Sequence, residues 1–250
     1  MKRPTNRTMY KFILSLLALT GLWAVVQFIP SDNEMANARD YGNKYENSKK
    51  YYRNQKHIPG RFDYYDLVLS WSPTYCETAG KHKREPQCTS GRPYSFVLHG
   101  VWPQYKKGWP QSCRTKKNPW ISREVIQSML DIMPSKGLII HEYKKHGTCS
   151  GLTPEGYYKL SRQLYNSVKI PPRYQKPSKP MLLSPKEIEN DFLIANPDMK
   201  PEMISIVCGK RRLKEIRICY DKGGKLTACG QNEYQKKLCR LPKVYLPPVR

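Results

Sequence analysis

Hydrophobic residues recur along the chain with two periods, one typical of strands and the other of helices. Four segments alternate or run apolar in the manner of strands: residues 65–71, 95–103, 203–208 and 213–220. The first is expected to end at Ser72-Pro73 and the second at Pro103, because proline cannot donate a hydrogen bond to a sheet. A Gly-Lys-Arg-Arg turn joins the last two strands.

Other segments carry the start or stop signals of helices. They are residues 123–133 between a Ser122 cap and Pro134, residues 141–146 ended by Gly147, residues 155–169 behind Thr153-Pro154, and a helix opened by Ser184 with the spacing of a capping box. Strands and helices are mixed, without regular alternation and without an internal repeat. We therefore expect an α+β fold.

The N-terminal pattern indicates export. Lys and Arg residues precede an apolar run at residues 12–29, and Asp32 and Glu34 follow it, an order that places the downstream chain outside the cytoplasm. The run just reaches membrane-spanning length, whereas residues 36–38 (Ala-Asn-Ala) form a cleavage-type site rather far downstream. Residues 1–30 are thus a signal peptide or a membrane anchor. The protein is expected in the periplasm or outside the cell, or tethered to the membrane with its folded part outside the cytoplasm.

The rest of the chain divides into a tether and a folded part. Residues 31–61 are polar with little hydrophobic periodicity, which predicts a linker. Residues 62–250 are expected to form one domain, since a chain of 250 residues accommodates one ordinary domain with appendages.

Charge narrows the choice of partners. The chain has 44 Lys and Arg against 20 Asp and Glu, for a formal net charge of +24. Such an excess favours polyanions, namely nucleic acid, anionic lipid or acidic glycan, without choosing among them. A soluble basic protein with a solvated surface would have the same composition.

The cysteines indicate disulfides. There are eight, and none forms a CxxC pair, so the spacing of a tetrahedral zinc site is absent. An even number of cysteines in an exported chain predicts four disulfide bonds in an oxidising compartment.

The segment HEYKKHGTC, residues 141–149, raises three possibilities: a zinc site, an acid–base cluster or a charged surface helix. His141 and His146 are five residues apart and diverge by about 140° on an α-helix, so they are poorly placed to share a metal. Glu142, Lys145 and His146, in contrast, are related by three and four residues and share a face. A surface helix with an ion pair would look the same, so the segment alone decides little.

A second histidine favours catalysis. His99 lies inside the apolar strand at 95–103, where a lone histidine is usually a core residue. Gly100 beside it permits close approach of a backbone or ligand, and Trp102 is expected on the same strand face as a stacking surface. Two facing imidazoles suit RNA cleavage, because a neutral one takes the proton of a ribose 2′-OH and a charged one gives a proton to the departing 5′-oxygen.

The two segments FVLHGVWP and HEYKKHGTC resemble the two signature segments of the ribonuclease T2 family, whose usual forms are close to FTIHGLWP and HEWEKHGTC. The strand YDLVLSWSPTYC resembles the family's first strand, and the similar organisation runs from about Phe62 to Cys239. The resemblance implies an antiparallel sheet flanked by helices. It also implies a secreted or periplasmic endoribonuclease that needs no cofactor and no metal.

Residue by residue, the resemblance implies a catalytic set of His99, Glu142 and His146. His146 is assigned as the base on the 2′-OH and His99 as the acid, a direction that the sequence does not fix. Single-stranded RNA would be cleaved through 2′,3′-cyclic phosphates to 3′-phosphates, with broad base specificity.

The same resemblance implies three substrate-binding residues: His141 and Lys145 at the phosphate, and Trp102 at a base or phosphate subsite. It further implies four disulfides, with the third nested inside the second: Cys113–Cys149, Cys208–Cys239, Cys219–Cys229 and a local Cys76–Cys88 pair like that of bacterial members. Tyr143, Lys144 and Gln104 depart from the family's usual residues, which puts base preference in doubt but not the chemistry.

Other residues are expected outside the site. Trp71, Trp109 and Trp120 are predicted in the core or at its rim, and His57 and His82 on the surface. Two other functions stay open at this point. One is a catalytically silent protein on the same fold that binds RNA or another polyanion, and the other is a membrane-tethered surface protein that interacts through partners. No obligate protein partner is evident from the sequence.

Overall fold

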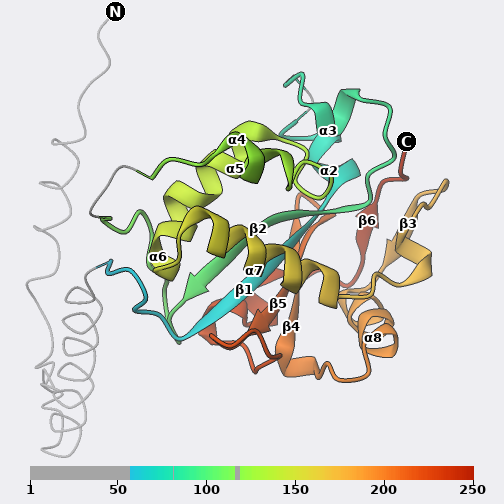
Figure 1. Cartoon of the computed structure of the whole chain (residues 1–250). Coiled ribbons are helices and arrows are strands. Elements are labelled where there is room, and N and C mark those ends of the chain that lie inside the picture. The colour runs from blue at the N-terminus through green and yellow to red at the C-terminus, as the bar shows by residue number, and fades with distance from the viewer. Residues whose placement is uncertain (1–56, 81, 116–118) are drawn as a thin grey trace, which may run out of the picture. The chain divides into compact units, whose positions relative to one another are not determined.

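The computed structural model describes residues 57–80, 82–115 and 119–250 (Figure 1). The apolar run at residues 12–29 and most of the predicted linker lie outside these ranges. Within them, no helix is both long and apolar enough to cross a membrane.

The strands form one six-stranded sheet with the order β2-β1-β5-β6-β3, and β4 pairs with β5 beside this path. Their bounds are β1 Tyr64–Trp71, β2 Phe96–Gln104, β3 Met181–Leu183, β4 Ile204–Gly209, β5 Arg212–Tyr220 and β6 Val244–Leu246. The pairs β1–β2, β1–β5, β4–β5 and β3–β6 are antiparallel, whereas β6 runs parallel to β5. The four predicted strands and the α+β class are confirmed.

The predicted stop at Pro103 was wrong. β2 continues through Pro103 to Gln104, and Pro103 is opposite Tyr65 of β1. A proline is tolerated there because β2 is the edge strand of the sheet, where a missing N–H leaves no central ladder bond unmade.

The helices are α2 Ser72–Glu77, α3 Pro86–Thr89, α4 Arg123–Gln127, α5 Lys136–Glu142, α6 Thr148–Ser150, α7 Pro154–Ser167, α8 Pro185–Ala195 and α9 Gln235–Leu238, with a π-helical turn at Tyr143–Gly147. The predicted caps are confirmed. Ser122 accepts from the Val125 N–H and Thr153 from the Gly156 N–H. The capping box at Ser184 is complete.

Two predicted helix ends were wrong. The helix after Ser122 stops at Gln127 instead of 133, because the chain turns so that the Ile132 carbonyl accepts the Leu98 N–H of the edge strand β2 at 2.8 Å. Gly147 does not end the helix predicted at residues 141–146. It lies inside the π-helical turn, where a Cβ would overlap the Tyr143 ring, and the helix ends at Gly151, whose φ of 79° suits glycine.

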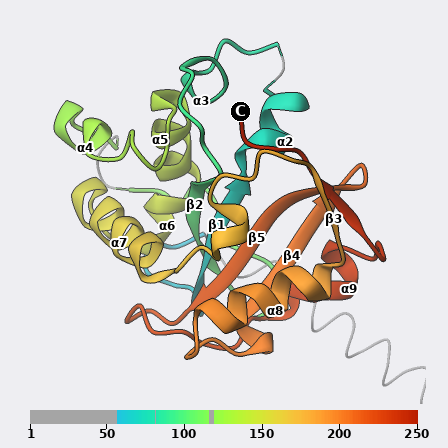
Figure 2. The same cartoon turned by 90° about the vertical axis from the view of Figure 1, so that its right-hand side faces the viewer.

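The main core lies on one face of the sheet. Helix α7 crosses β1 and β2, and α8 packs beside β4 (Figures 1 and 2). Leu67, Leu69 and Leu98 are fully buried on this face. The Tyr157 hydroxyl of α7 donates to the Val101 carbonyl at 2.8 Å, which ties the helix to the edge strand. Trp71 is also fully buried, as predicted for the core.

All four implied disulfides are present: Cys76–Cys88, Cys113–Cys149, Cys208–Cys239 and Cys219–Cys229. Cys113–Cys149 fastens the segment after β2 to α6, which follows the π-helical turn. A disulfide stabilises mainly by restricting the unfolded chain, typically by ~2–4 kcal/mol.

Candidate active site

His99 is the extra residue of a β-bulge in β2. Val68 and Leu69 are consecutive on β1, but their partners on β2, Gly100 and Leu98, are separated by His99. Residues three apart in a regular strand point to opposite faces, so alternation alone would not bring His99 and Trp102 together. The bulge re-aims the imidazole, and the two ring centroids lie 5.2 Å apart. The expected shared face therefore exists because of an irregularity that the sequence pattern does not reveal.

Gly100 makes room for the carboxylate of Glu142. A Cβ at this position would overlap the Glu142 carboxylate and lie 2.6 Å from Trp102 Nε1. Trp102 Nε1 donates to Glu142 Oε2 at 2.6 Å, and Glu142 Oε1 lies 3.7 Å from His99 Nε2. The close approach expected at Gly100 is thus made by a side chain from the last residue of α5.

His146 lies against Trp102. Its ring stacks on Trp102, with centroids 4.8 Å apart and an interplanar angle of 19°. Burial, together with the positive charges of Lys145, His99 and His141, lowers the pKa of His146 to about 3. Its Nδ1 is buried and has no hydrogen-bond partner among the described residues. At neutral pH the ring is therefore uncharged and keeps a nitrogen lone pair.

The π-helical turn changes the geometry assumed for this segment. Its hydrogen bonds run from residue i to i+5, which widens the helix after Glu142. The α-helical angle between His141 and His146 therefore does not apply. Glu142 and His146 both point inward and are buried, whereas His141 is exposed.

Glu142 is a buried carboxyl among positive charges. Burial raises its pKa, and the nearby His99, the Trp102 hydrogen bond, His141 and Lys145 oppose that rise. Lys145 is half-buried and acts on Glu142 and His146 through its charge. A group in such a balance can hold or release a proton as charge in the site changes.

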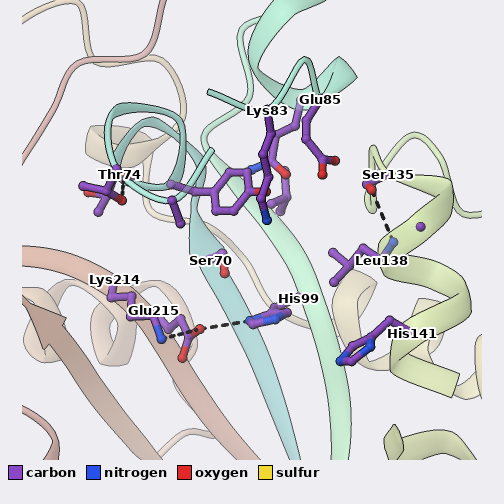
Figure 3. Close-up of a pocket in the computed structure, with 16 residues that line it drawn as sticks. Ser70, Thr74, Lys83, Glu85, His99, Ser135, Leu138, His141, Lys214 and Glu215 are labelled. Atoms are coloured by element: carbon purple, nitrogen blue, oxygen red, sulfur yellow. Dashed lines mark hydrogen bonds and ion pairs between the residues drawn. The ribbon is translucent and has the colours of Figure 1, made fainter. Parts of the chain in front are cut away.

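Sequence analysis missed the partner of His99. Glu215 of β5 lies beside it, with His99 Nδ1 2.9 Å from Glu215 Oε1 (Figure 3). Burial alone would raise the pKa of Glu215, but the hydrogen bond and charge of His99, with Lys214 and Arg217, lower it to about 2. An ionised carboxylate only accepts hydrogen bonds, so Nδ1 carries the proton and Nε2 faces Glu142.

Arg217 was missed as well. Its guanidinium lies 5.0 Å from the Trp102 ring centroid, 3.5 Å from Glu215 Oε2 and 3.6 Å from Asp66 Oδ2. Asp66 is fully buried, and burial raises its pKa well above the usual range against the charge of Arg217. The signal in the sequence was the alternation of Glu215 and Arg217 in KEIRICY, where polar residues at every second position mark one strand face.

A cavity of about 430 Å³ opens beside His99. Its lining comes from three parts of the fold: the strand face with Ser70, Val97 and Glu215, helix α5 with Leu138 and His141, and the α2–α3 region with Thr74, Lys83, Glu85 and Gln87. Figure 3 shows His99 between Glu215 and His141 at the floor of this cavity. The walls combine apolar side chains with hydrogen-bonding groups, a combination typical of small-molecule pockets.

The predicted site residues fall into two groups. His99, Glu142 and His146 each contact Trp102, and Glu142 Oε1 also lies 3.7 Å from His99 Nε2. His141 and Lys145 lie around them, His141 on the cavity wall and Lys145 as a nearby charge. Trp102 is held on three sides, by Glu142, His146 and Arg217, so its ring supports the cluster. Among the described residues, no group of three or more His, Cys, Asp or Glu side chains could hold a metal ion.

This arrangement can carry out concerted proton transfer. One imidazole is neutral and desolvated, and a second is positioned by a carboxylate that accepts from its Nδ1. The Glu142 carboxyl group lies 3.7 Å from the second imidazole, and the positive charges of Lys145 and His141 act on the same cluster, where they would stabilise an anion.

Comparison with known proteins gives one consistent group. The model of the Ribonuclease T2 family matches residues 62–229. A protein named "Ribonuclease" from Aeromonas hydrophila is 34% identical over 203 residues, covering 76% of this chain and 88% of that protein. "Ribonuclease I" of Escherichia coli is 26% identical over 148 residues, covering 44% of this chain and 55% of that protein.

Solved structures share the fold. An RNase-related protein from Calystegia sepium superposes with a TM-score of 0.60 at 21% identity, covering 76% of this chain and 98% of that one. A mutant of RNase MC1 in complex with 5′-UMP superposes with a TM-score of 0.55 at 23% identity, covering 67% of this chain and 93% of that one.

Proposed function

The chain belongs to the ribonuclease T2 family and is an endoribonuclease, and from this premise we propose that it cleaves single-stranded RNA by a two-histidine mechanism with broad base specificity. The observation that carries the proposal is the pair of imidazoles in different states: His146 buried and neutral, His99 paired with an ionised carboxylate.

In the first step, His146 accepts the proton of the 2′-OH, and the 2′-oxygen forms a bond to phosphorus. The bond from phosphorus to the 5′-oxygen breaks, and His99 gives its proton to that oxygen. The products are a 2′,3′-cyclic phosphate and a free 5′-OH. The low pKa of His146 supports its role as base, since it is uncharged at neutral pH. The contact with Glu215 supports His99 as acid, because the carboxylate accepts from Nδ1 and so fixes the ring with Nε2 directed at the site.

In the second step the roles reverse. Water attacks the cyclic phosphate, the bond to the 2′-oxygen breaks, and a 3′-phosphate remains. Glu142, Lys145 and His141 stabilise the negative charge of the pentacoordinate phosphorus in both steps. Their positions around the imidazoles support this role, and DNA should not be cut because it lacks the 2′-OH.

We assign the cavity beside His99 to the base of a nucleotide next to the scissile bond. Val97 and Leu138 offer apolar contact, while Ser70, Gln87 and Ser135 offer donors and acceptors. Because these polar groups are neutral and can both donate and accept, they support tolerance of several bases over strict selection of one.

Export is part of the proposal. Four disulfides agree with an oxidising compartment, and we propose that the enzyme acts in the periplasm or outside the cell. RNA is the proposed partner.

The test is digestion of single-stranded RNA by the purified protein in excess EDTA, beside His99→Ala and His146→Ala. We expect 2′,3′-cyclic ends from the wild type and loss of cleavage with retained RNA binding in each variant. A disulfide-bonded wild type that binds RNA and leaves it intact would refute the proposal and make the protein a binder.

A further inference from the structure

A second hollow lies on the outer side of helix α5, away from the cavity beside His99. It measures about 470 Å³. We propose that this hollow, called the outer groove below, is a separate binding site for single-stranded RNA, where Trp120 stacks on a base and three cations contact phosphates. The inference rests on the proposed function, because it concerns RNA beyond the nucleotides that are cleaved.

The floor of the outer groove is apolar. Ile121 and Ile126 are buried there, and Ile140 of α5 is half-buried beside them. Such a floor can take the flat, weakly hydrated face of a nucleobase.

Trp120 forms the rim of the groove and is the most exposed large hydrophobic residue among those described, with 82% of its surface accessible. Sequence analysis placed it in the core or at its rim, and its indole is almost entirely in solvent. Folding gains little from an indole in that position, whereas an aromatic ring beside an apolar hollow is the element that single-strand-binding proteins use to hold bases.

The charged side chains that line the outer groove are all positive. Arg123, Lys136 and Lys144 line it, and the lining contains no carboxylate among the described residues. All three side chains are exposed. The cations can contact the phosphates of RNA, and the indole ring and the apolar floor can contact its bases. This complementarity favours RNA over a neutral peptide.

Helix α5 connects the two sites. Leu138 and His141 on one side line the catalytic cavity, while Lys136, Ile140 and Lys144 on the other line the outer groove. A helix with its side chains is about 10–12 Å across, so a strand leaving the cavity reaches the outer groove by passing over one helix. Longer RNA can therefore occupy both sites, whereas a dinucleotide can occupy only the catalytic one.

The test compares two substrates with the full chain: a dinucleoside monophosphate and a single-stranded RNA of about 20 nucleotides. Trp120→Ala should lower kcat/KM for the long RNA by roughly 5- to 150-fold, the size of one base–aromatic stack. It should leave the dinucleotide unchanged, and Trp120→Phe should restore most of the loss. Ile194→Ala, which removes another exposed hydrophobic (80% accessible) on α8, is the matched control and should behave as wild type.

Salt dependence tests the cations. Replacing Arg123, Lys136 and Lys144 by Gln should reduce the slope of log kcat/KM against log salt for the long RNA by about 2, since each phosphate contact on a single strand contributes about 0.7. Lys200→Gln, at an exposed lysine outside the groove, is the control.

The inference is overturned if the Trp120→Ala variant cuts long RNA as fast as the wild type, or if it cuts both substrates more slowly by the same factor. It is also overturned if the substitution changes the mass measured by sedimentation, since the groove would then be an interface between copies of the chain. If the wild type cuts neither substrate, the proposed function fails on its own. The groove is then judged by binding of a 2′-O-methyl RNA, whose Kd must rise about tenfold in Trp120→Ala.

Discussion

The contact between Glu215 and His99 leads to the sharpest prediction. Glu215→Gln keeps the size of the side chain and an oxygen that can accept from His99 Nδ1, but it removes the charge that lies 2.9 Å away. If His99 is the general acid, the carboxylate fixes the orientation of its ring through a charge-assisted hydrogen bond. The variant should therefore fold normally but lose activity.

The magnitude follows from the type of hydrogen bond. A bond between charged groups contributes ~1.5–3 kcal/mol and a neutral one ~0.5–1.5 kcal/mol, so the substitution removes about 1–2 kcal/mol. At ~1.4 kcal/mol per tenfold, kcat/KM should fall roughly 5- to 30-fold at pH 7–8.

The assay is kcat/KM on a dinucleoside monophosphate from pH 4 to 9. Glu77→Gln serves as the control, because it also removes an acidic charge from an ion pair, with Arg212 at 2.7 Å, yet it lies outside the site. Thermal unfolding of both variants establishes that they fold. A loss in Glu215→Gln no larger than the loss in Glu77→Gln would remove Glu215 from the mechanism.

Three further predictions concern the same cluster. Gly100→Ala should lower kcat and should reduce the free energy of unfolding by ~1–3 kcal/mol through overpacking, because its Cβ overlaps the Glu142 carboxylate. Steady-state kinetics and calorimetry check both effects, and normal kinetics would contradict the packing argument. Replacing Cys113 and Cys149 by Ser should lower the free energy of unfolding, measured in urea, by ~2–4 kcal/mol. If the disulfide holds the helical segment with Glu142 and His146 in place, catalysis should be lost at a lower urea concentration than the global unfolding transition. The pKa of the buried His146 is about 3, against ~6.5 in the unfolded chain, so the native state binds fewer protons. Its contribution to stability is therefore present above pH 6.5 and is lost as the pH falls to about 3. The unfolding free energies of wild type and His146→Gln, measured by urea titration, should converge as the pH falls, and an equal pH dependence of the two would contradict this.

The elements with strong local signals could be predicted from the sequence. Caps at Ser122, Thr153 and Ser184 set the starts of three helices, since each depends on side chains within three residues of one another. The meeting of His99 with Glu142 could be proposed because both lie in signature segments that resemble one family.

What could not be predicted depends on contacts between distant parts of the chain. Glu215 reaches His99 only through the register of β5 on β1, where Glu215 is opposite Ser70, and no local pattern specifies that pairing. The bulge at His99 and the π-helical turn after Glu142 are departures from regular periodicity, so a reading based on regular periods overlooks them. The helix after Ser122 ended early because a tertiary hydrogen bond to β2 outweighed helix propensity.

The central claim is that the ribose 2′-OH of the substrate is the nucleophile and that His146 takes its proton. The most direct measurement uses a DNA oligonucleotide with a single ribonucleotide at a known position, digested by the wild type in excess EDTA, with product ends identified by mass. We predict one cut, on the 3′ side of that ribonucleotide, leaving a 2′,3′-cyclic phosphate. No cut should occur with His146→Ala or in the same oligonucleotide carrying a 2′-O-methyl group. Cleavage at deoxynucleotides, or a cut beside the 2′-O-methyl residue, would contradict it.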